Sequence, residues 1–224
     1  MRFRYAITVV ACLLAAPAHA FDVRQIIADS RMLNARVDAE FDQHRSSEAP
    51  LYFRFALPAE SDALRVQVEP LDHPGYMELA FFDPEGALAE MVMMTHAQLT
   101  DVAPDDRLSV TALLMRDRFF PRLTQGRTDV EMLNLQGLMT GGHASVELTG
   151  VYREDRAGDA LIFVRMVGIL PPDGEAALIV GSLINSSVQN PEGPDDLAAG
   201  FGGHIARSVQ FVARRYADGA MVPY

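Results

Sequence analysis

Four strand patterns follow one another between residues 130 and 184, and they restrict the fold more than any other feature of the sequence. They are the segments VEMLNLQGLM, ASVELTGVYR, ALIFVRMVGIL and ALIVGSLI. The connections TGG, EDRAGD and PPDGE are short and rich in turn-forming residues, which favours antiparallel neighbours. The third segment is apolar on both faces apart from Arg165, which predicts a central strand that is covered on each side.

Helical and further strand patterns surround this sheet. Residues 103–120 predict a helix, with Pro104 near its first position and two aspartates in its first turn. A final helix is predicted from Gly193-Pro194 onward, because apolar residues recur there at spacings of four and three: Leu197, Phe201, Ile205, Val209, Val212 and Tyr216. Strand patterns lie between residues 51 and 82, and residues 88–99 continue the sheet or cross over to the next element. The predicted fold class is α+β, a single domain with a mostly antiparallel sheet packed against two or three helices.

The first twenty residues have the features of a secretory signal peptide. A basic start, MRFR, precedes an apolar stretch and a small-residue exit with Ala18 and Ala20 at the A-x-A positions. The apolar run is too short to span a bilayer, so we expect cleavage near Ala20 and a periplasmic or secreted mature protein. The segment VVAC also loosely resembles a lipoprotein box, which would leave Cys12 acylated; the apolar residues that follow Cys12 argue against this alternative.

The mature chain is expected to comprise residues 21–50, a helix and a linker, and residues 51–224, the α+β domain. The helix is predicted from Asp22 to about Gln43, because Asp22 and Gln25 form a capping-box pattern and apolar residues follow at helical spacing. A polar linker, HRSSEAP, follows this helix.

Two amino acids that carry much of protein chemistry are missing from the mature chain. Cys12 is the single cysteine, and all 19 basic residues are arginines. Disulfides, thiol nucleophiles, zinc–thiolate sites, iron–sulfur clusters, Schiff-base enzymes and phosphate-loop NTPases are therefore excluded, and we predict no cofactor. The formal net charge is −11, which opposes binding to nucleic acid.

The tripeptide GGH occurs twice and places His143 and His204 behind glycine pairs. Both copies are internal, so neither has the free amino terminus with which such a tripeptide binds Cu(II). We interpret the first pair as a turn that needs positive φ, and the second as a helix that approaches the sheet closely. His143 and His204 stay candidate ligand-binding residues.

Four more residues are candidates for a site. Met91, Met93 and His96 lie within EMVMMTH, and thioether and imidazole ligands suit copper. In a strand, Met91 and Met93 would share one face and His96 would lie on the other, so these donors could not converge. Arg165, a charge inside an apolar strand, needs either a bound anion or a carboxylate partner, and the partner would be Glu131, Glu147 or Glu154.

The order of elements resembles the PsbP-like fold, named for an extrinsic subunit of the photosynthetic water-oxidising complex. The resemblance covers roughly residues 51–211: an F-x-F-x-L-P strand (Phe53–Pro58), further strands, a mid-chain helix, a three-strand meander and a helix that runs into ARSVQF. It implies an accessory or assembly role rather than catalysis. The additional N-terminal helix and the bacterial-type signal depart from the pattern, so the photosynthetic role is not carried over.

The sequence contains no serine-hydrolase elbow, H-E-x-x-H motif, dinucleotide fingerprint or Walker loop. We therefore expect an exported protein with a non-enzymatic binding, scaffold or assembly role. Its partner would be another envelope protein, with no nucleic acid, no membrane span and an unspecified small-molecule ligand. A periplasmic copper-binding protein using Met and His ligands, and a hydrolase of unknown type, stay open as alternatives.

Overall fold

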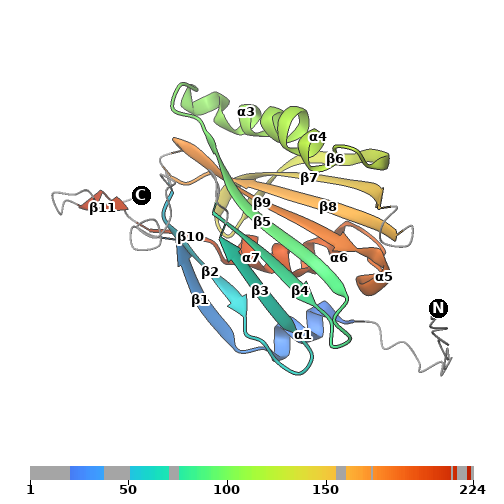
Figure 1. The fold of residues 1–224 in the computed structure, drawn as a ribbon. Coiled ribbons are helices and arrows are strands. Elements are labelled where there is room, and N and C mark those ends of the chain that lie inside the picture. The colour runs from blue at the N-terminus through green and yellow to red at the C-terminus, as the bar shows by residue number, and fades with distance from the viewer. Residues whose placement is uncertain are drawn as a thin grey trace, which may run out of the picture.

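A seven-stranded antiparallel sheet forms the centre of the molecule (Figure 1), as the sequence predicts. The computed structural model describes residues 21–37, 51–70, 76–154, 160–172, 174–212, 214–215 and 221–222. The strands of this sheet, in spatial order, are β3 (Arg65–Pro70), β4 (Met77–Phe82), β5 (Leu88–Gln98), β9 (Ala176–Asn185), β8 (Ala160–Ile169), β7 (His143–Glu154) and β6 (Thr128–Thr140). Consecutive strands of the meander β6 to β9 pair as antiparallel neighbours, with two register shifts between β6 and β7.

One face of the sheet is covered by a helical segment that runs from residue 104 to residue 123. It consists of η1 (Pro104–Asp106), α3 (Arg107–Leu114), a π-helical turn η2 (Met115–Phe119) and α4 (Phe120–Leu123). The π turn lies directly before Pro121, which cannot donate a backbone hydrogen bond. Gly150 and Gly168 lie beneath this segment, where a Cβ would be 2.5 Å from the Phe120 ring and 2.6 Å from Thr111 Cγ2. The predicted mid-chain helix is confirmed.

The opposite face carries three short helices and a second, smaller sheet. The helices are α5 (Ser186–Gln189), α6 (Pro194–Ala199) and α7 (Phe201–Ser208). The smaller sheet has the antiparallel order β1 (Met32–Val37), β2 (Phe53–Pro58) and β10 (Gln210–Phe211). Helix α1 (Val23–Asp29) precedes it, and β11 (Arg214–Arg215) pairs with β12 (Met221–Val222). The large side chains of this layer, among them Phe53, Phe55 and Phe201, form one core with Phe81 and other residues of the main sheet.

The prediction of a long N-terminal helix is wrong after Asp29. Asp22 does cap a helix, since its carboxylate accepts from the Gln25 N–H, but that helix has seven residues. Met32–Val37 instead pairs antiparallel with β2, whose alternate side chains Phe53 and Phe55 are buried. The spacing of apolar residues suited a helix, but pairing with a strand that is distant in sequence decided the conformation. Residues 38–50, with the predicted linker, lie outside the described residues.

The prediction of one continuous final helix is also wrong. The backbone at Gly200 is extended, with ψ 176°, and separates α6 from α7. Helix α7 ends at Ser208, and the next residues pair with β2, so Val212 is not helical. Tyr216 and the predicted signal peptide, residues 1–20 with Cys12, lie outside the described residues. None of the helices in the described part of the chain is long and apolar enough to span a membrane.

Candidate functional site

A row of polar side chains crosses the sheet on the face that α6 and α7 cover. The strand register places Ser182 of β9 opposite Arg165 of β8, and Arg165 opposite Thr149 of β7. Glu90 of β5 and Glu147 of β7 lie at the two sides of this row, and both are buried. A buried charge is costly unless it has a hydrogen-bond or ion-pair partner, so the partners of both carboxylates matter for stability.

Glu90 caps helix α7 from the middle of the sheet. The N–H groups of Phe201 and Gly202 donate to Glu90 Oε2 (2.9 Å) and Oε1 (2.8 Å). The carboxylate thus satisfies two of the N–H groups that a helix leaves unpaired in its first turn, because the N-cap residue Gly200 has no side chain. A Cβ at Gly200 would lie 2.8 Å from Glu90 Oε2, so glycine is needed for this approach. The sequence analysis missed Glu90, although a lone acid in an apolar strand is the same signal that identified Arg165.

Burial raises the pKa of Glu90 above its usual value of 4.5, although hydrogen bonds from Gly202, Phe201, Gln189 and Ser182 oppose this effect. The folded state therefore holds the Glu90 proton more tightly than the unfolded state does. Protonation of Glu90 therefore stabilises the folded state relative to the unfolded state. This stabilisation is fully present below pH 4.5 and is lost as the pH rises through the raised pKa of Glu90.

Glu90→Gln is expected to remove this pH dependence. Urea unfolding of the wild type and of the Gln variant between pH 4 and pH 8 measures it. The wild type should lose stability relative to the variant as the pH rises. If the wild type instead gained stability relative to the variant over the same range, the pKa of Glu90 would be lowered. The hydrogen bonds to Glu90 would then outweigh the effect of burial.

Arg165 finds its partner in Glu147, one of the three carboxylates that the sequence named. Arg165 Nε donates to Glu147 Oε1 at 2.6 Å, and the two side chains are 5% and 9% exposed. The second oxygen of Glu147 accepts from Gln136 Nε2 of β6 at 2.9 Å. Burial, together with the positive charge of Arg165, lowers the pKa of Arg207 on α7, so a second guanidinium lies near the first. The pair explains Arg165 as a structural residue.

The first GGH tripeptide forms a turn, and the second lies in helix α7 against the sheet, as predicted. Gly141 and Gly142 form the β6–β7 turn with φ of 59° and 87°. A Cβ at Gly141 would lie 2.7 Å from the carbonyl oxygen of Arg207, so this turn contacts the C-terminal end of α7. A Cβ at Gly202 in the second segment would lie 1.7 Å from Ser182 Oγ.

The two histidines have separate surroundings. The ring of His143 packs edge-on against Phe211, with 5.0 Å between ring centroids. Nε2 of His204 is buried and has no hydrogen-bond partner among the described residues. Burial lowers the pKa of both imidazoles. Within the described part of the chain, no three His, Cys, Asp or Glu side chains are grouped as a metal site requires.

The candidate copper ligands lie on strand β5, on different faces. Met94 belongs to the core on the α7 side, and the ring of His96 packs against Tyr76 of that core, with 5.4 Å between centroids. Met91 and Met93 alternate with Met94 along the strand and therefore face the other side. Met91, Met93 and His96 thus cannot meet at one ion, and no contact in the described residues favours the copper alternative.

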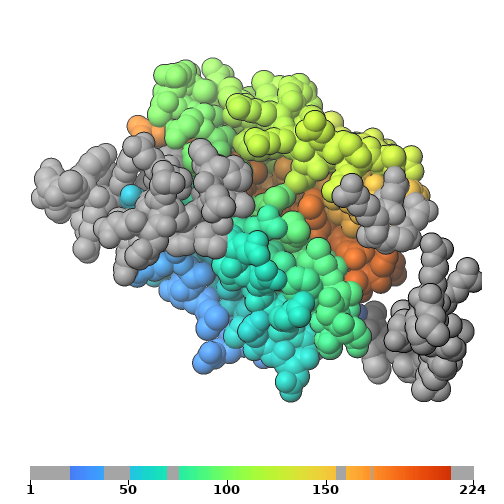
Figure 2. Space-filling view, viewed as in Figure 1, coloured from blue at the N-terminus to red at the C-terminus, as the bar shows by residue number. Residues whose placement is uncertain are grey.

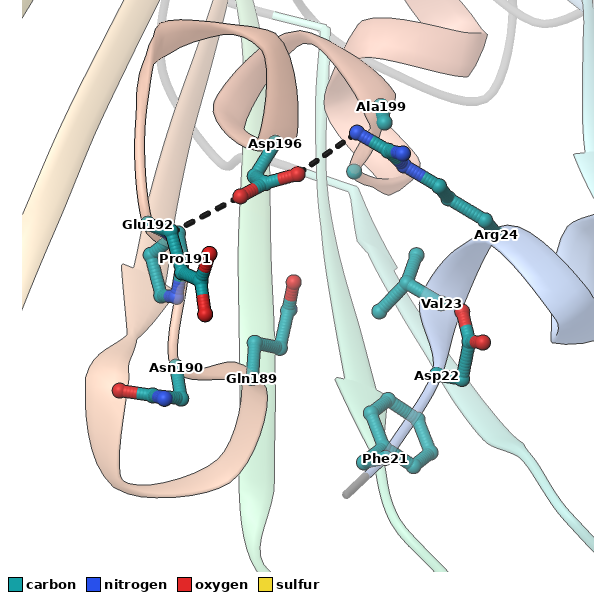
Figure 3. A pocket seen from close by; sticks show the side chains of 11 residues that line it. Phe21, Asp22, Val23, Arg24, Gln189, Asn190, Pro191, Glu192, Asp196 and Ala199 are labelled. Atoms are coloured by element: carbon teal, nitrogen blue, oxygen red, sulfur yellow. Dashed lines mark hydrogen bonds and ion pairs between the residues drawn. The ribbon is translucent and has the colours of Figure 1, made fainter.

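A pocket of about 400 Å³ (Figure 3) is lined in part by Gln189 and Gly200, the residues next to the Glu90 carboxylate. Residues of the α1 segment form one side, and residues between α5 and α6 form the other. Asp196 joins the two sides, because it accepts from Arg24 Nη2 (2.6 Å) and from the N–H of Glu192 (2.9 Å). Asp22 adds a third carboxylate against the single arginine, so the pocket is acidic. Its two sides are about 170 residues apart in sequence, as Arg24 and Asp196 show, so local patterns could not reveal it.

The two edges of the main sheet differ in how they are protected. Edge strand β3 has six residues, and its sequence includes Arg65, Glu69 and Pro70. The N–H of Val66 in this strand donates to the Glu60 carboxylate. Edge strand β6 has thirteen residues, nearly all exposed. It carries four of the seven exposed large hydrophobic side chains of the described chain: Val130, Met132, Leu133 and Met139. Natural edge strands are usually shortened, charged or covered, and β6 lacks these features over most of its length.

Comparison with known proteins finds similar folds and no related sequence. No model of a protein family matches the sequence, and no curated protein sequence matches it. Among solved structures, LpqN of Mycobacterium tuberculosis, described as involved in cell envelope biogenesis, is 13% identical, with a TM-score of 0.44 over 88% of this chain and 99% of LpqN. The Ran-binding protein Mog1p of Saccharomyces cerevisiae is 10% identical, with a TM-score of 0.46 over 80% of this chain and 96% of its own.

The comparison also includes the family that the order of elements resembles. Cyanobacterial PsbP from Synechocystis sp. PCC 6803 is 13% identical, with a TM-score of 0.44 over 80% of this chain and 92% of its own. This PsbP structure is therefore one of those to which the chain is similar. Likeness at this level concerns the arrangement of elements, and no activity or partner is taken from it.

Proposed function

We propose that this protein is an exported envelope protein that binds an extended segment of a partner along the outer edge of β6, without catalysing a reaction. The observation that carries the proposal is the open, apolar edge of β6. From Asn134 to Thr140 the strand pairs residue by residue with β7, and no other described strand pairs with it. Figure 2 shows the yellow-green segment that includes α4 and β6 at the surface of the molecule.

Strand addition suits this edge for two reasons. The unpaired N–H and C=O groups of an edge strand bind an extended peptide through main-chain hydrogen bonds. Exposed apolar side chains beside the edge, such as Leu133 and Met139, add surface for the side chains of that peptide. The two bulges of β6 fall between Thr128 and Asn134. The half from Asn134 to Thr140 keeps regular strand geometry, and Leu133 lies at the second bulge, directly before it.

A different protein is a better occupant than a second copy of this chain. The formal net charge is −11, and removal of Arg2 and Arg4 with the predicted signal peptide would change it to −13. Two copies would therefore repel each other, whereas a neutral or basic partner would not. Export is supported by the signal-peptide pattern of residues 1–20. For the same reason we expect the partner to be another envelope protein.

The experiment uses the absence of cysteine from the mature chain to attach a cross-linker at one chosen position. Leu133 on β6 and Val68 on β3 are both 49% exposed, so Leu133→Cys and Val68→Cys are matched probes of the two edges. Each variant, labelled with a photo-reactive maleimide, is incubated with the native envelope, and the linked peptides are sequenced by mass spectrometry. We expect the label on β6 to capture one defined, extended apolar segment of a partner.

Competition with unlabelled protein makes the result specific. Unlabelled Val68→Asp should compete for the captured segment as well as the wild type does. Unlabelled Leu133→Asp should compete at least tenfold less well, because a charge at the edge opposes strand pairing. Equal capture from both edges, or capture of a second copy of this chain, would contradict the proposal.

A further inference from the structure

Positive charge is concentrated on the helical segment that covers the sheet. Residues 107–127 contain five arginines and one acidic residue, Asp117, which is a net charge of +4 in a chain whose total is −11. Three of these arginines have partners. Arg116 binds Asp117, Arg127 pairs with Glu154, and Arg107 Nε donates to the carbonyl oxygen of Val102. The two that remain, Arg118 and Arg122, require an explanation.

Arg118 and Arg122 line a pocket of about 470 Å³ between the helical segment and the end of β5. Neither guanidinium has a hydrogen bond or ion pair with any residue that the structure describes. Arg118 and Arg122 are four residues apart and point to the same side of the helix. The other residues that line the pocket are uncharged or weakly basic: Thr95, His96, Ala97, Gln98, Leu114 and Phe119. The described residues that line the pocket therefore carry two positive charges and no carboxylate.

The composition of the wall suits a ligand with an anionic end and an apolar body. Gln98 and Thr95 can donate further hydrogen bonds, whereas Leu114 and Phe119 offer apolar surface. A volume in this range is typical of small-molecule sites, which combine apolar walls with a few polar groups.

We propose that this pocket binds the phosphate group of a small anionic ligand, held by Arg118 and Arg122. The planar guanidinium presents paired N–H donors that match two oxygens of a phosphate, and two such forks can share one phosphate group. The phosphate can belong to a soluble phosphate monoester or to the headgroup of an anionic lipid. The site is separate from the β6 edge, so it does not depend on the proposed function.

Binding is tested with the mature protein and three probes. Inorganic phosphate and glycerol phosphate are titrated by calorimetry at low ionic strength, and phosphatidylglycerol vesicles are compared with phosphatidylcholine vesicles by co-sedimentation. The Arg118→Gln/Arg122→Gln variant should bind the successful probe at least tenfold more weakly. Arg116→Gln is the matched control, because Arg116 lies on the same segment but is paired with Asp117. It should bind like the wild type.

The three probes distinguish the source of the phosphate. Saturable binding of either soluble phosphate that is lost in the double variant identifies a soluble ligand. Binding confined to anionic vesicles, with the same loss, identifies a lipid headgroup. Absence of binding to all three probes, or an equal loss in Arg116→Gln, overturns the proposal. Thermal unfolding of each variant shows that lost binding is not lost folding.

Discussion

Gly202→Ala is expected to destabilise the folded protein by about 3 kcal/mol or more. A Cβ at this position would lie 1.7 Å from Ser182 Oγ and 3.1 Å from Glu90 Oε1. Helix α7 would therefore have to move away from the sheet, or Ser182 and Glu90 would have to shift. Either movement weakens the hydrogen bonds that the Phe201 and Gly202 N–H groups donate to the buried Glu90 carboxylate. Both the steric overlap and the weakened hydrogen bonds therefore lower the free energy of unfolding.

Urea unfolding measures this effect, and two further variants make it interpretable. Gly137→Ala is the matched control, because a Cβ at Gly137 meets no atom within 4 Å. It should change stability by less than about 1 kcal/mol. Ser182→Ala in the Gly202→Ala background removes the oxygen that clashes and should restore part of the loss. A Gly202→Ala variant as stable as the wild type would mean that α7 does not lie this close to the sheet.

The elements that could be predicted from sequence are those that local patterns specify. The meander β6 to β9 was recognised because each strand alternates or is uniformly apolar, and because each turn contains glycine or proline at the required place. The helix that begins at Pro104 was recognised by its first turn, where Asp105 and Asp106 complement the helix dipole. The sequence pattern of β5 does not distinguish a strand from a crossover connection, because an apolar segment of eleven residues is compatible with both.

Tertiary contacts decided the elements that were predicted wrongly. The apolar residues in and before Met32–Val37 have helical spacing. This segment instead forms strand β1, which pairs with the edge of β2. Gly200 separates α6 from α7 because the chain must bring the Phe201 N–H to the Glu90 carboxylate, 111 residues away in sequence. No window of local sequence contains both residues, so the position of this break could not be predicted.

The candidate site was predictable only in part, for the same reason. Arg165 was recognised as a charge in an apolar strand, yet the choice among Glu131, Glu147 and Glu154 depended on strand register. Register places Thr149 opposite Arg165 and brings Glu147, two residues earlier in β7, within reach of the guanidinium. The pocket of Arg118 and Arg122 was missed because two arginines in a helix are ordinary until their partners, or the lack of them, are known.

Glu147→Ala is expected to destabilise the protein by about 3–5 kcal/mol, because it leaves the Arg165 guanidinium buried without a counter-charge. The side chain of Arg165 is 5% exposed, so water cannot replace the lost carboxylate. Arg207 adds to the loss, because the positive charges of Arg207 and Arg165 repel each other. The loss is measured by urea unfolding at neutral pH. Asp117→Ala, which removes the carboxylate of an exposed pair with Arg116, should leave stability unchanged.

The double variant Glu147→Leu/Arg165→Met separates the value of the pair from the cost of breaking it. Replacing a buried ion pair by apolar side chains of similar size is often neutral or stabilising, so this variant should lie within about 1 kcal/mol of the wild type. If it does, the pair adds little net stability, and removal of one partner is costly because of the charge that is left behind. If Glu147→Ala alone is tolerated, Arg165 must obtain a counter-charge elsewhere, as it would from a bound anion. That result would support the alternative prediction, in which Arg165 is a ligand-binding residue.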